Sequence, residues 1–312
     1  MPQNRTSLKT GIRTAASGTS RSRRDWIIGL CIAAAFIIAI LWMAARVSGN
    51  RSGETVRFSE GGGNVGVVEL LGPIYSSERI VKQFETFGKQ KSVKAIVFRI
   101  ESPGGYVAPS QEIYEAAKRV RDGGKPVVVS MGTVAASGGY YAACGGDTVV
   151  ANPGTTTGSI GVIAEFMNAE KLLDKIGVKF ETLKSGRFKD SGSPYRELTE
   201  ADKAYLQSWI DDAYGQFVDV VSAERGLDRE AVLGIADGRV FTGRQALEIG
   251  LVDTLGDYRD AIRIAGRMGK IKGEPELIRW RSRRITLFDL LFQQTEGVLR
   301  HLGGARLAYR MP

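Results

Sequence analysis

Short glycine-rich clusters that contain serine follow three of the predicted strands. They are SPGG at 102–105, ASGGYY at 136–141 and TGSIG at 157–161. A fourth cluster, KSGRFKD at 184–190, follows a further predicted strand. In an open α/β sheet the carboxyl ends of the strands form the edge at which ligands bind. We therefore expect the chemistry of this protein at that edge.

Ser137 is the first candidate for a reactive group. It follows alanine and precedes two glycines, so that a substrate backbone could approach its hydroxyl closely. A serine at the start of a helix also lies beside N–H groups without intrahelical acceptors, which can stabilise an oxyanion. The alternative is structural, because a serine among small residues is more often only a helix cap or a turn residue.

A serine nucleophile needs a base, and the only histidine, His301, lies in an Arg-rich tail near the C-terminus. A lysine can serve instead if burial disfavours its ammonium form and leaves a neutral amine. Lys189 is the candidate, because glycines and serines around it predict an irregular loop. Ser159 could orient that amine. Alternatively, Lys189 belongs to a solvated basic face, and Ser159 is a turn serine.

Other site chemistries are disfavoured by composition. One histidine and two cysteines supply neither a His-rich zinc site nor a disulfide framework, so we predict no metal and no cofactor. The chain contains no GxxxxGK[ST], and no GxGxxG joins a strand to a helix, which argues against nucleotide binding. We expect Cys144 to be a small buried apolar residue.

The net charge of +9 belongs to the chain's ends. Residues 1–24 carry +6 and residues 279–312 carry +5, so the body between them is nearly neutral. A nucleic-acid-binding domain would carry a basic face on the fold itself, so no nucleic-acid partner is predicted.

Residues 26–45 are uncharged and predict a transmembrane helix. A helix of this length spans about 30 Å, the thickness of a bilayer core. The arginines that precede it predict a cytoplasmic N-terminus. A cleaved signal peptide, a buried core helix and an organelle transit peptide are the alternatives.

The remaining chain alternates predicted strands and helices, which indicates an α/β fold with a mainly parallel sheet. Strands are predicted at 65–70, 93–100, 126–132, 147–151, 160–166 and 179–184, with a further short one near 240. Helices are predicted from 76–77 to 87, from 109 to 123–124, and at 135–144, 169–177 and 199–225. The predicted organisation is a basic tail (1–25), the transmembrane helix (26–45), a linker (46–64), a catalytic domain (65–272) and a basic, partly apolar tail (273–312).

Five ordered motifs together resemble the bacterial signal peptide peptidase A family. They are SPGG at 102–105, ASGGYYAA at 136–143, GTTTGSIGV at 154–162, KSGRFKD at 184–190 and GRVFTGRQALEIGLVDTLG at 238–256. The resemblance covers roughly residues 65–270 and is to the short form of the family, which has a single unit behind one membrane anchor.

The resemblance implies a crotonase/Clp-protease-like fold and a Ser–Lys dyad. By motif, Ser137 is the nucleophile, Lys189 the general base and Ser159 the serine that hydrogen-bonds the lysine. The backbone amides of Gly104 and Gly138 match the oxyanion hole. The family forms homo-oligomers in which the Ser and Lys of one site can come from neighbouring subunits.

The resemblance also implies substrates and a location. The substrates would be cleaved signal peptides left in the membrane and other short or unfolded polypeptides. The chain would be a single-pass protein of the bacterial inner membrane with its peptidase domain on the periplasmic side. Val134, Val162 and Ile163 could line an apolar substrate groove. The rival hypotheses are a catalytically silent membrane scaffold of the same fold and a crotonase-type acyl-CoA enzyme.

The chain departs from the family at Glu101, where the residue before SPGG is usually asparagine. A carboxylate at this position could hold a nearby loop through backbone N–H groups, or it could bias the charge of Lys189. The sequence leaves both possibilities open.

Overall fold

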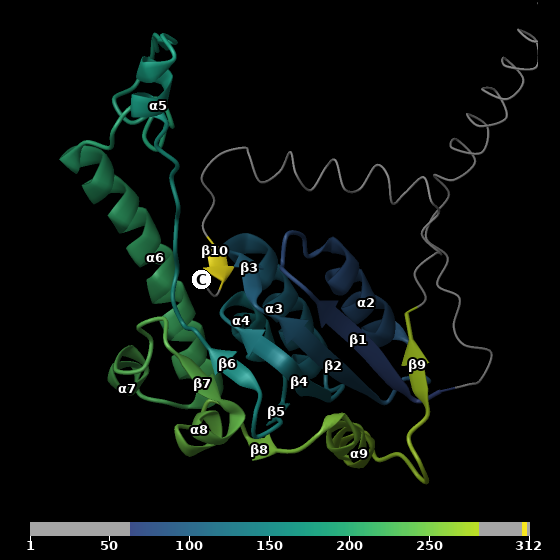
Figure 1. Cartoon of the computed structure of the whole chain (residues 1–312). Helices are drawn as coiled ribbons and strands as arrows, with labels where there is room; N and C mark the ends of the chain where they lie inside the picture. Colours follow the sequence, from purple (N-terminus) through teal and green to yellow (C-terminus); the bar gives the residue numbers. More distant parts are fainter. Residues whose placement is uncertain (1–62, 281–307, 311–312) are drawn as a thin grey trace, which may run out of the picture. The chain divides into compact units, whose positions relative to one another are not determined.

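A mainly parallel β-sheet forms the centre of the folded domain (Figure 1). The computed structural model describes residues 63–280 and 308–310, and in them the sheet has the order β7-β6-β4-β2-β1-β9, with β5 beside β4 and β8 beside β5. All these pairs are parallel except β6–β7. The mixed α/β fold and the mainly parallel sheet predicted from the sequence are therefore confirmed.

The strands and helices alternate along most of the chain. The strands are β1 (Val65–Leu71), β2 (Ala95–Ser102), β3 (Gly104–Tyr106), β4 (Val127–Ala136), β5 (Thr148–Ala151), β6 (Thr156–Gly158), β7 (Val240–Thr242), β8 (Thr254–Leu255), β9 (Leu277–Arg279) and β10 (Ala308–Arg310). The helices are α2 (Glu78–Lys89), α3 (Val107–Asp122), α4 (Gly138–Ala143), α5 (Glu170–Lys175), α6 (Glu200–Arg225), α7 (Arg229–Leu233), α8 (Gly243–Glu248) and α9 (Tyr258–Met268).

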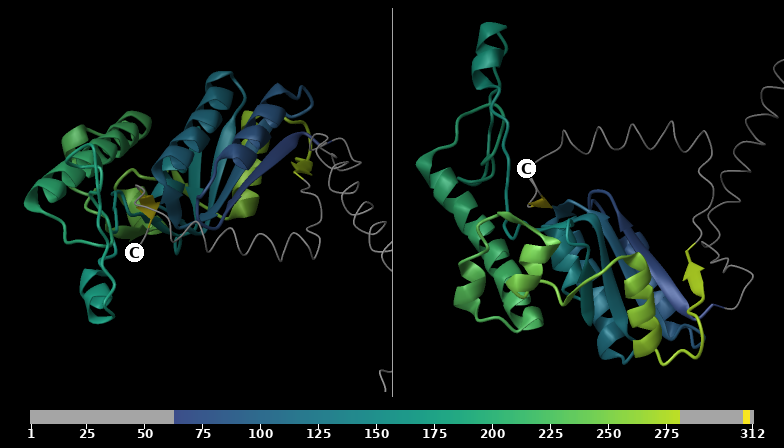
Figure 2. Two further views of the ribbon diagram at one scale, coloured as in Figure 1. Left: turned by 90° about the horizontal axis from the view of Figure 1, so that it is seen from above. Right: turned by 60° about the horizontal axis from the view of Figure 1, so that its bottom comes forward.

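Both faces of the sheet are covered, as the two views in Figure 2 show. On β2, Ile96, Phe98 and Ile100 point into the large core shared with α2 and α3. The alternate residues Ala95 and Val97 pack in a smaller core against α9. Burial on both faces explains why the central strands are almost continuous runs of apolar residues.

The strand β4 changes neighbours along its length. Val128–Ser130 pair with β5, whereas Val134–Ala136 pair with β6. Between these parts the pairing with β2 jumps from Ile100↔Met131 to Ser102↔Ala135. A bulge of this kind bends a strand and redirects its end, and here it carries the end of β4 to β6.

Residues 161–199 form an arm that contains α5 and leads into α6 (Figure 1). The predictions of strands at 160–166 and 179–184 were wrong, because no named strand forms in either segment. In the second segment the strand-like composition reflects apolar residues that lie at the surface: Phe180 is 52% exposed and Leu183 fully exposed. The predicted helix at 135–144 is shorter, because Ala135 and Ala136 belong to β4.

Several local predictions are confirmed. Pro109 lies in the first turn of α3, which ends at Gly123. The helix predicted at 199–225 is α6, and Thr199 and Asp202 form a capping box at its start. Cys144 is a buried free thiol.

The segment predicted to cross a membrane, 26–45, lies outside the described residues, as do the linker and most of the C-terminal tail. Among residues 63–280 and 308–310, no helix combines the length and the apolar character that a bilayer crossing requires.

Glu224 ties α6 to α3 through a buried polar cluster. Its carboxylate, 9% exposed, accepts hydrogen bonds from the Tyr114 hydroxyl at 2.6 Å and from Arg121 at 2.8 Å, and it pairs with Lys118. Burial opposes the charged form, but the hydrogen bonds from Arg121, Lys118 and Tyr114 outweigh it and lower the pKa of Glu224 to about 2.

Glu224→Gln should therefore lower the free energy of unfolding by about 2 kcal/mol near neutral pH. Because the folded-state pKa is depressed, this stabilisation is present above the unfolded pKa of about 4.3 and is lost as pH falls toward 2. Urea denaturation at pH 7 and at acid pH measures the difference, with the exposed Glu115→Gln as control. A difference between wild type and Glu224→Gln that did not shrink on acidification would contradict this account.

Candidate active site

Ser137 occupies the turn between the end of β4 and the start of α4. Its backbone has φ 55° and ψ −121°, a conformation that non-glycine residues rarely adopt. The residue is fully buried, and its Oγ has no hydrogen-bond partner among the described residues. Backbone strain and an unsatisfied buried hydroxyl both cost free energy, and such strain clusters at functional sites. Ser137 thus has the environment expected of a reactive serine.

Ser159 lies beside Ser137 at the same edge of the sheet. Ala136 pairs with Gly158 in parallel register, and the Ser137 N–H donates to the Gly158 carbonyl at 2.8 Å. Ser159 is also buried and also has a positive φ, 50°. The structure therefore brings together two of the serines predicted for the site.

The loop that contains Gly104 lies against the start of α4. Gly104 has φ 101°, which favours glycine, and its N–H donates to Ser102 Oγ at 3.2 Å. A Cβ on Gly139 would lie 2.9 Å from the Ser102 carbonyl oxygen, so α4 approaches this loop closely only because the residue is glycine. Gly138 is the first residue of α4, where N–H groups have no intrahelical acceptor.

The strand β3, which begins at Gly104, also accepts an added strand. Residues 308–310 form β10 and pair with it antiparallel, with Arg310 opposite Gly104 and Ala308 opposite Tyr106. An extended chain segment can therefore bond to this edge.

Lys189 lies on the arm, in a stretch of exposed residues, whereas Ser137 is buried at the sheet edge. The structure does not bring the two together within one chain: no hydrogen bond or ion pair joins them. Nearby, Lys184 pairs with Asp190 and Arg187 stacks on Phe188. The Lys189 amine has no partner among the described residues.

The backbone that carries Lys189 is nevertheless held firmly, because Arg196 bridges two carboxylates. Arg196 donates to Asp190 at 2.8 and 2.9 Å and to Asp202 at 2.7 Å. Asp202 also accepts from Ser191 and Thr199. The hydrogen bonds from Arg196 are the main reason that the pKa of Asp190 and that of Asp202 lie well below their usual range. We call Asp190, Arg196 and Asp202 the arm clamp.

Glu101 has a role that the sequence left open. Its carboxylate accepts the N–H groups of Thr133 at 2.8 Å and of Val134 at 3.1 Å, inside the bulge of β4. These contacts support the first of the two possibilities, in which Glu101 holds a loop through its backbone N–H groups, and none of them involves Lys189.

Two threonines that were not singled out from the sequence also hold this part of β4. Thr155 donates to the Gly132 carbonyl and Thr157 to that of Ala135, both at 2.7 Å. The run TTT at 155–157 was the available signal.

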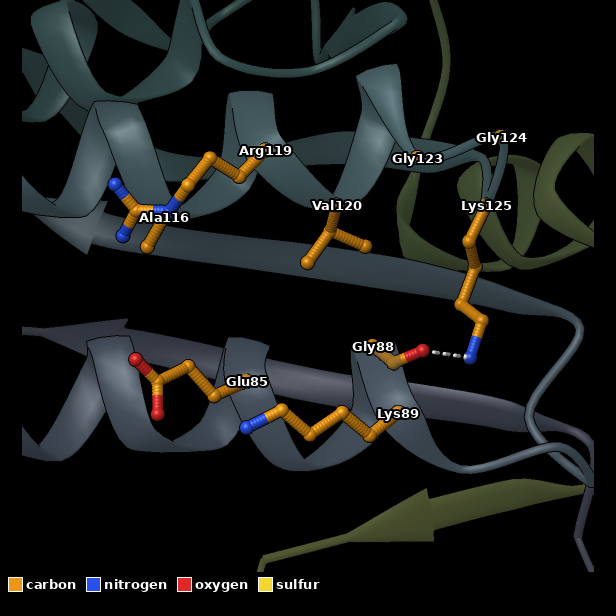
Figure 3. Close-up of a pocket in the computed structure, with 9 residues that line it drawn as sticks. All are labelled: Glu85, Gly88, Lys89, Ala116, Arg119, Val120, Gly123, Gly124 and Lys125. Atoms are coloured by element: carbon orange, nitrogen blue, oxygen red, sulfur yellow. Dashed lines mark hydrogen bonds between the residues drawn. The ribbon is translucent and has the colours of Figure 1, made fainter.

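A hollow of about 340 Å³ between α2 and α3 lies apart from these residues (Figure 3). None of its lining residues is a predicted site residue. Lys125 crosses its end and donates to the carbonyls of Phe87, Gly88 and Gln90, which caps α2. Burial lowers the pKa of Lys125.

Potential metal ligands are sparse in the part of the chain that the structure describes. No three His, Cys, Asp or Glu residues there are grouped so as to hold a metal ion. Burial raises the pKa of Cys144 to about 12, so its thiol is protonated at neutral pH.

Two family models match the chain: peptidase family S49 over residues 119–272 and Clp protease over residues 67–156. A protein of Synechocystis sp. named as a candidate protease is 50% identical over 196 residues, which are 62% of this chain and 70% of that protein. The chain belongs to peptidase family S49. The resemblance to signal peptide peptidase A is thereby confirmed, and this S49 protein is a peptidase whose substrates are peptides.

Two further relatives are longer than the matched region. A candidate signal peptide peptidase SppA of Enterococcus faecium is 39% identical over 188 residues, covering 60% of this chain and 55% of that protein. The chloroplastic serine protease SPPA of Arabidopsis thaliana is 33% identical over 207 residues, covering 66% of this chain but 30% of that protein.

Arg196→Gln should loosen the loop that carries Lys189, because it breaks both bridges of the arm clamp. We expect faster amide hydrogen exchange at 189–193, where the N–H groups of Lys189, Ser191 and Ser193 bond within the loop, and an unchanged rate in β4. Arg229→Gln, which removes a single exposed ion pair, is the control. Equal exchange in the two variants would show that the clamp does not order this loop.

Proposed function

We propose that this S49 peptidase is a membrane-anchored serine endopeptidase that uses a Ser–Lys dyad. The observation that carries the proposal is Ser137, a strained and buried serine whose Oγ has no partner among the described residues. Its Oγ attacks the scissile carbonyl while the neutral amine of Lys189 takes the hydroxyl proton. Lys189 then protonates the leaving amine, and water activated by the same lysine hydrolyses the acyl-enzyme. Ser159, beside Ser137, orients the lysine.

The oxyanion would be held by the N–H groups of Gly104 and Gly138. The Gly104 N–H donates to Ser102 Oγ over a long 3.2 Å. The oxyanion can replace this hydroxyl as the acceptor, because charge-assisted hydrogen bonds are shorter and stronger than neutral ones. Gly138 directly follows Ser137 in the chain, and Gly104 belongs to the segment whose Ser102 lies against Gly139 of α4.

The dyad is proposed to form between subunits of a homo-oligomer. Lys189 is carried on an arm apart from Ser137, and the arm exposes a set of large apolar side chains. They are Met167, Leu172, Ile176, Phe180, Leu183 and Phe188. Large apolar side chains exposed in such number on one segment are typical of protein–protein contacts. Their burial against a second copy would also exclude water from Lys189, which favours the neutral amine.

Substrates would bind as an extended strand on the edge of β3. The antiparallel pairing of β10 with this edge supports such a mode, because its register includes Gly104, one of the two proposed oxyanion residues. Half-buried Val134 and Val162 and the exposed Ile163 offer apolar contacts near Ser137. The proposed substrates are remnants of cleaved signal peptides and other unfolded polypeptides, which can bind in extended form.

The proposed location follows from the N-terminal sequence. Residues 26–45 would anchor the chain in the bacterial inner membrane, with the N-terminus in the cytoplasm and the peptidase domain on the periplasmic side. The strained backbone of Ser137 argues against the silent-scaffold alternative, because a scaffold has no use for such strain.

Ser137→Ala and Lys189→Ala should each lower peptide cleavage roughly a thousandfold or more. Co-expressed with different tags and purified together as mixed oligomers, the two variants should recover about one quarter of wild-type activity. Only an intact serine facing an intact lysine from a neighbour restores a site.

Activity retained by Ser137→Ala alone would overturn the nucleophile. Inactive single variants that gave no recovery in mixed oligomers would instead place the dyad within one chain. Ser208→Ala, an exposed serine on α6, is the matched control and should leave cleavage unchanged.

The pH dependence of kcat/KM should show activity lost on acidification, because a protonated lysine cannot accept the serine proton. The measurement is the initial rate on a peptide without titratable groups, from acid to alkaline pH. Lys189→Arg should be inactive throughout, since guanidinium stays protonated. A profile that is flat on the acid side would argue against a lysine base.

A further inference from the structure

The bulge of β4 leaves backbone groups that the sheet cannot satisfy. Residues 132–134 stand opposite the single residue Glu101, because the pairing jumps from Ile100↔Met131 to Ser102↔Ala135. Unpaired N–H and carbonyl groups at such a point cost free energy unless side chains or water bond to them. The bulge lies three residues before Ser137.

Side chains supply the missing partners. The two oxygens of Glu101 accept the N–H groups of Thr133 and Val134, and Thr155 donates to the Gly132 carbonyl. Arg99 holds the strand just before the bulge, since it donates to Ser130 Oγ at 2.9 Å and to the Met131 carbonyl at 3.1 Å. Its second guanidinium nitrogen lies 3.9 Å from Glu101.

We propose that Glu101 is a positioning residue for Ser137. Its carboxylate fixes the shape of the bulge, and the bulge determines where β4 ends and how its last residues meet β6. The strained φ of Ser137 is then imposed from two sides, by the bulge before it and by its bond to the Gly158 carbonyl. This inference rests on the proposed role of Ser137 as nucleophile.

The chemistry of a carboxylate suits this task better than that of an amide. Two adjacent N–H donors require two acceptor oxygens, and an ionised carboxylate offers both. Glutamine in the same place would offer one oxygen and turn an NH₂ group toward an N–H. The brace should therefore weaken in Glu101→Gln and disappear in Glu101→Ala.

Gly132 provides an independent means of removing the same brace. A Cβ at this residue would lie 1.8 Å from Glu101 Oε2 and 3.0 Å from Arg99. Its φ is not positive, so alanine is compatible with the backbone there. Gly132→Ala should dislodge the carboxylate while leaving residue 101 unchanged.

The experiment compares Glu101→Gln, Glu101→Ala, Gly132→Ala and the double variant Glu101→Ala/Gly132→Ala in the full chain. A peptide nitrophenyl ester gives a burst that counts the acylating serines, and steady-state cleavage gives kcat per counted site and KM. Glu69→Gln is the matched control, because Glu69 has a similar exposure (35% against 37%) on the neighbouring strand but pairs with Arg279.

We expect kcat per site to fall about tenfold in Glu101→Gln and Gly132→Ala and up to about a hundredfold in Glu101→Ala, with KM changed less than about twofold. The double variant should resemble Glu101→Ala, because both changes remove one interaction. A merely structural role would lower the number of active sites and the melting temperature but leave kcat per site unchanged.

Unchanged kcat per site in Glu101→Gln and Gly132→Ala would overturn the inference, even if Glu101→Ala failed to fold. Additive losses in the double variant would also overturn it. Either result would leave the proposed function intact as long as the burst remained and Ser137→Ala abolished it. Loss of the proposed function would appear instead as a burst that persists in Ser137→Ala.

Discussion

The hydrogen bond from the Ser137 N–H to the Gly158 carbonyl, 2.8 Å long, joins the ends of β4 and β6. The site depends on this junction, because it sets Ser137 and Ser159 next to each other, each with a positive φ that serine does not favour. The bond can form only because β4 leaves its pairing with β2 at a bulge and turns to β6. A continuous ladder between β2 and β4 would carry the same residues elsewhere.

The strained backbone at this junction is held in place by the packing around it. Both faces of the sheet are buried, and the cores on either side hold β2 and β4 from their alternate residues. Across the sheet edge, the glycines at 104 and 139 allow α4 and the 102–105 loop to approach each other. Small residues around Ser137 therefore matter for the packing of backbone on backbone as much as for access by a substrate.

Much of this could be predicted from the sequence, for physical reasons. The central strands are buried on both faces and so appear as apolar runs, as at 93–100 and 126–132. Because the carboxyl ends of parallel strands meet at one edge of a sheet, the sequence also placed Ser137 and Ser159 at the same edge.

Other features could not be predicted. The short strand β6 was missed, because a strand of three residues has too few positions to show an alternating pattern. Part of the arm was wrongly predicted to be a strand, because Phe180 and Leu183 are apolar but lie exposed on the surface instead of buried in the sheet. The role of Glu101 depends on a bulge, and a bulge is a matter of register that composition does not encode.

The two residues of the proposed dyad lie in parts of the protein that are held in place by different interactions. Ser137 belongs to the sheet edge, buried and held by strain, whereas Lys189 belongs to an arm whose loop is ordered by charges, through Arg196 and two carboxylates. A base needs low solvent access to remain neutral, and an exposed loop does not offer it. If the site forms between subunits, burial of the apolar arm supplies the water exclusion that the lysine requires. Activity would then follow assembly, because a single chain would hold a nucleophile without a base.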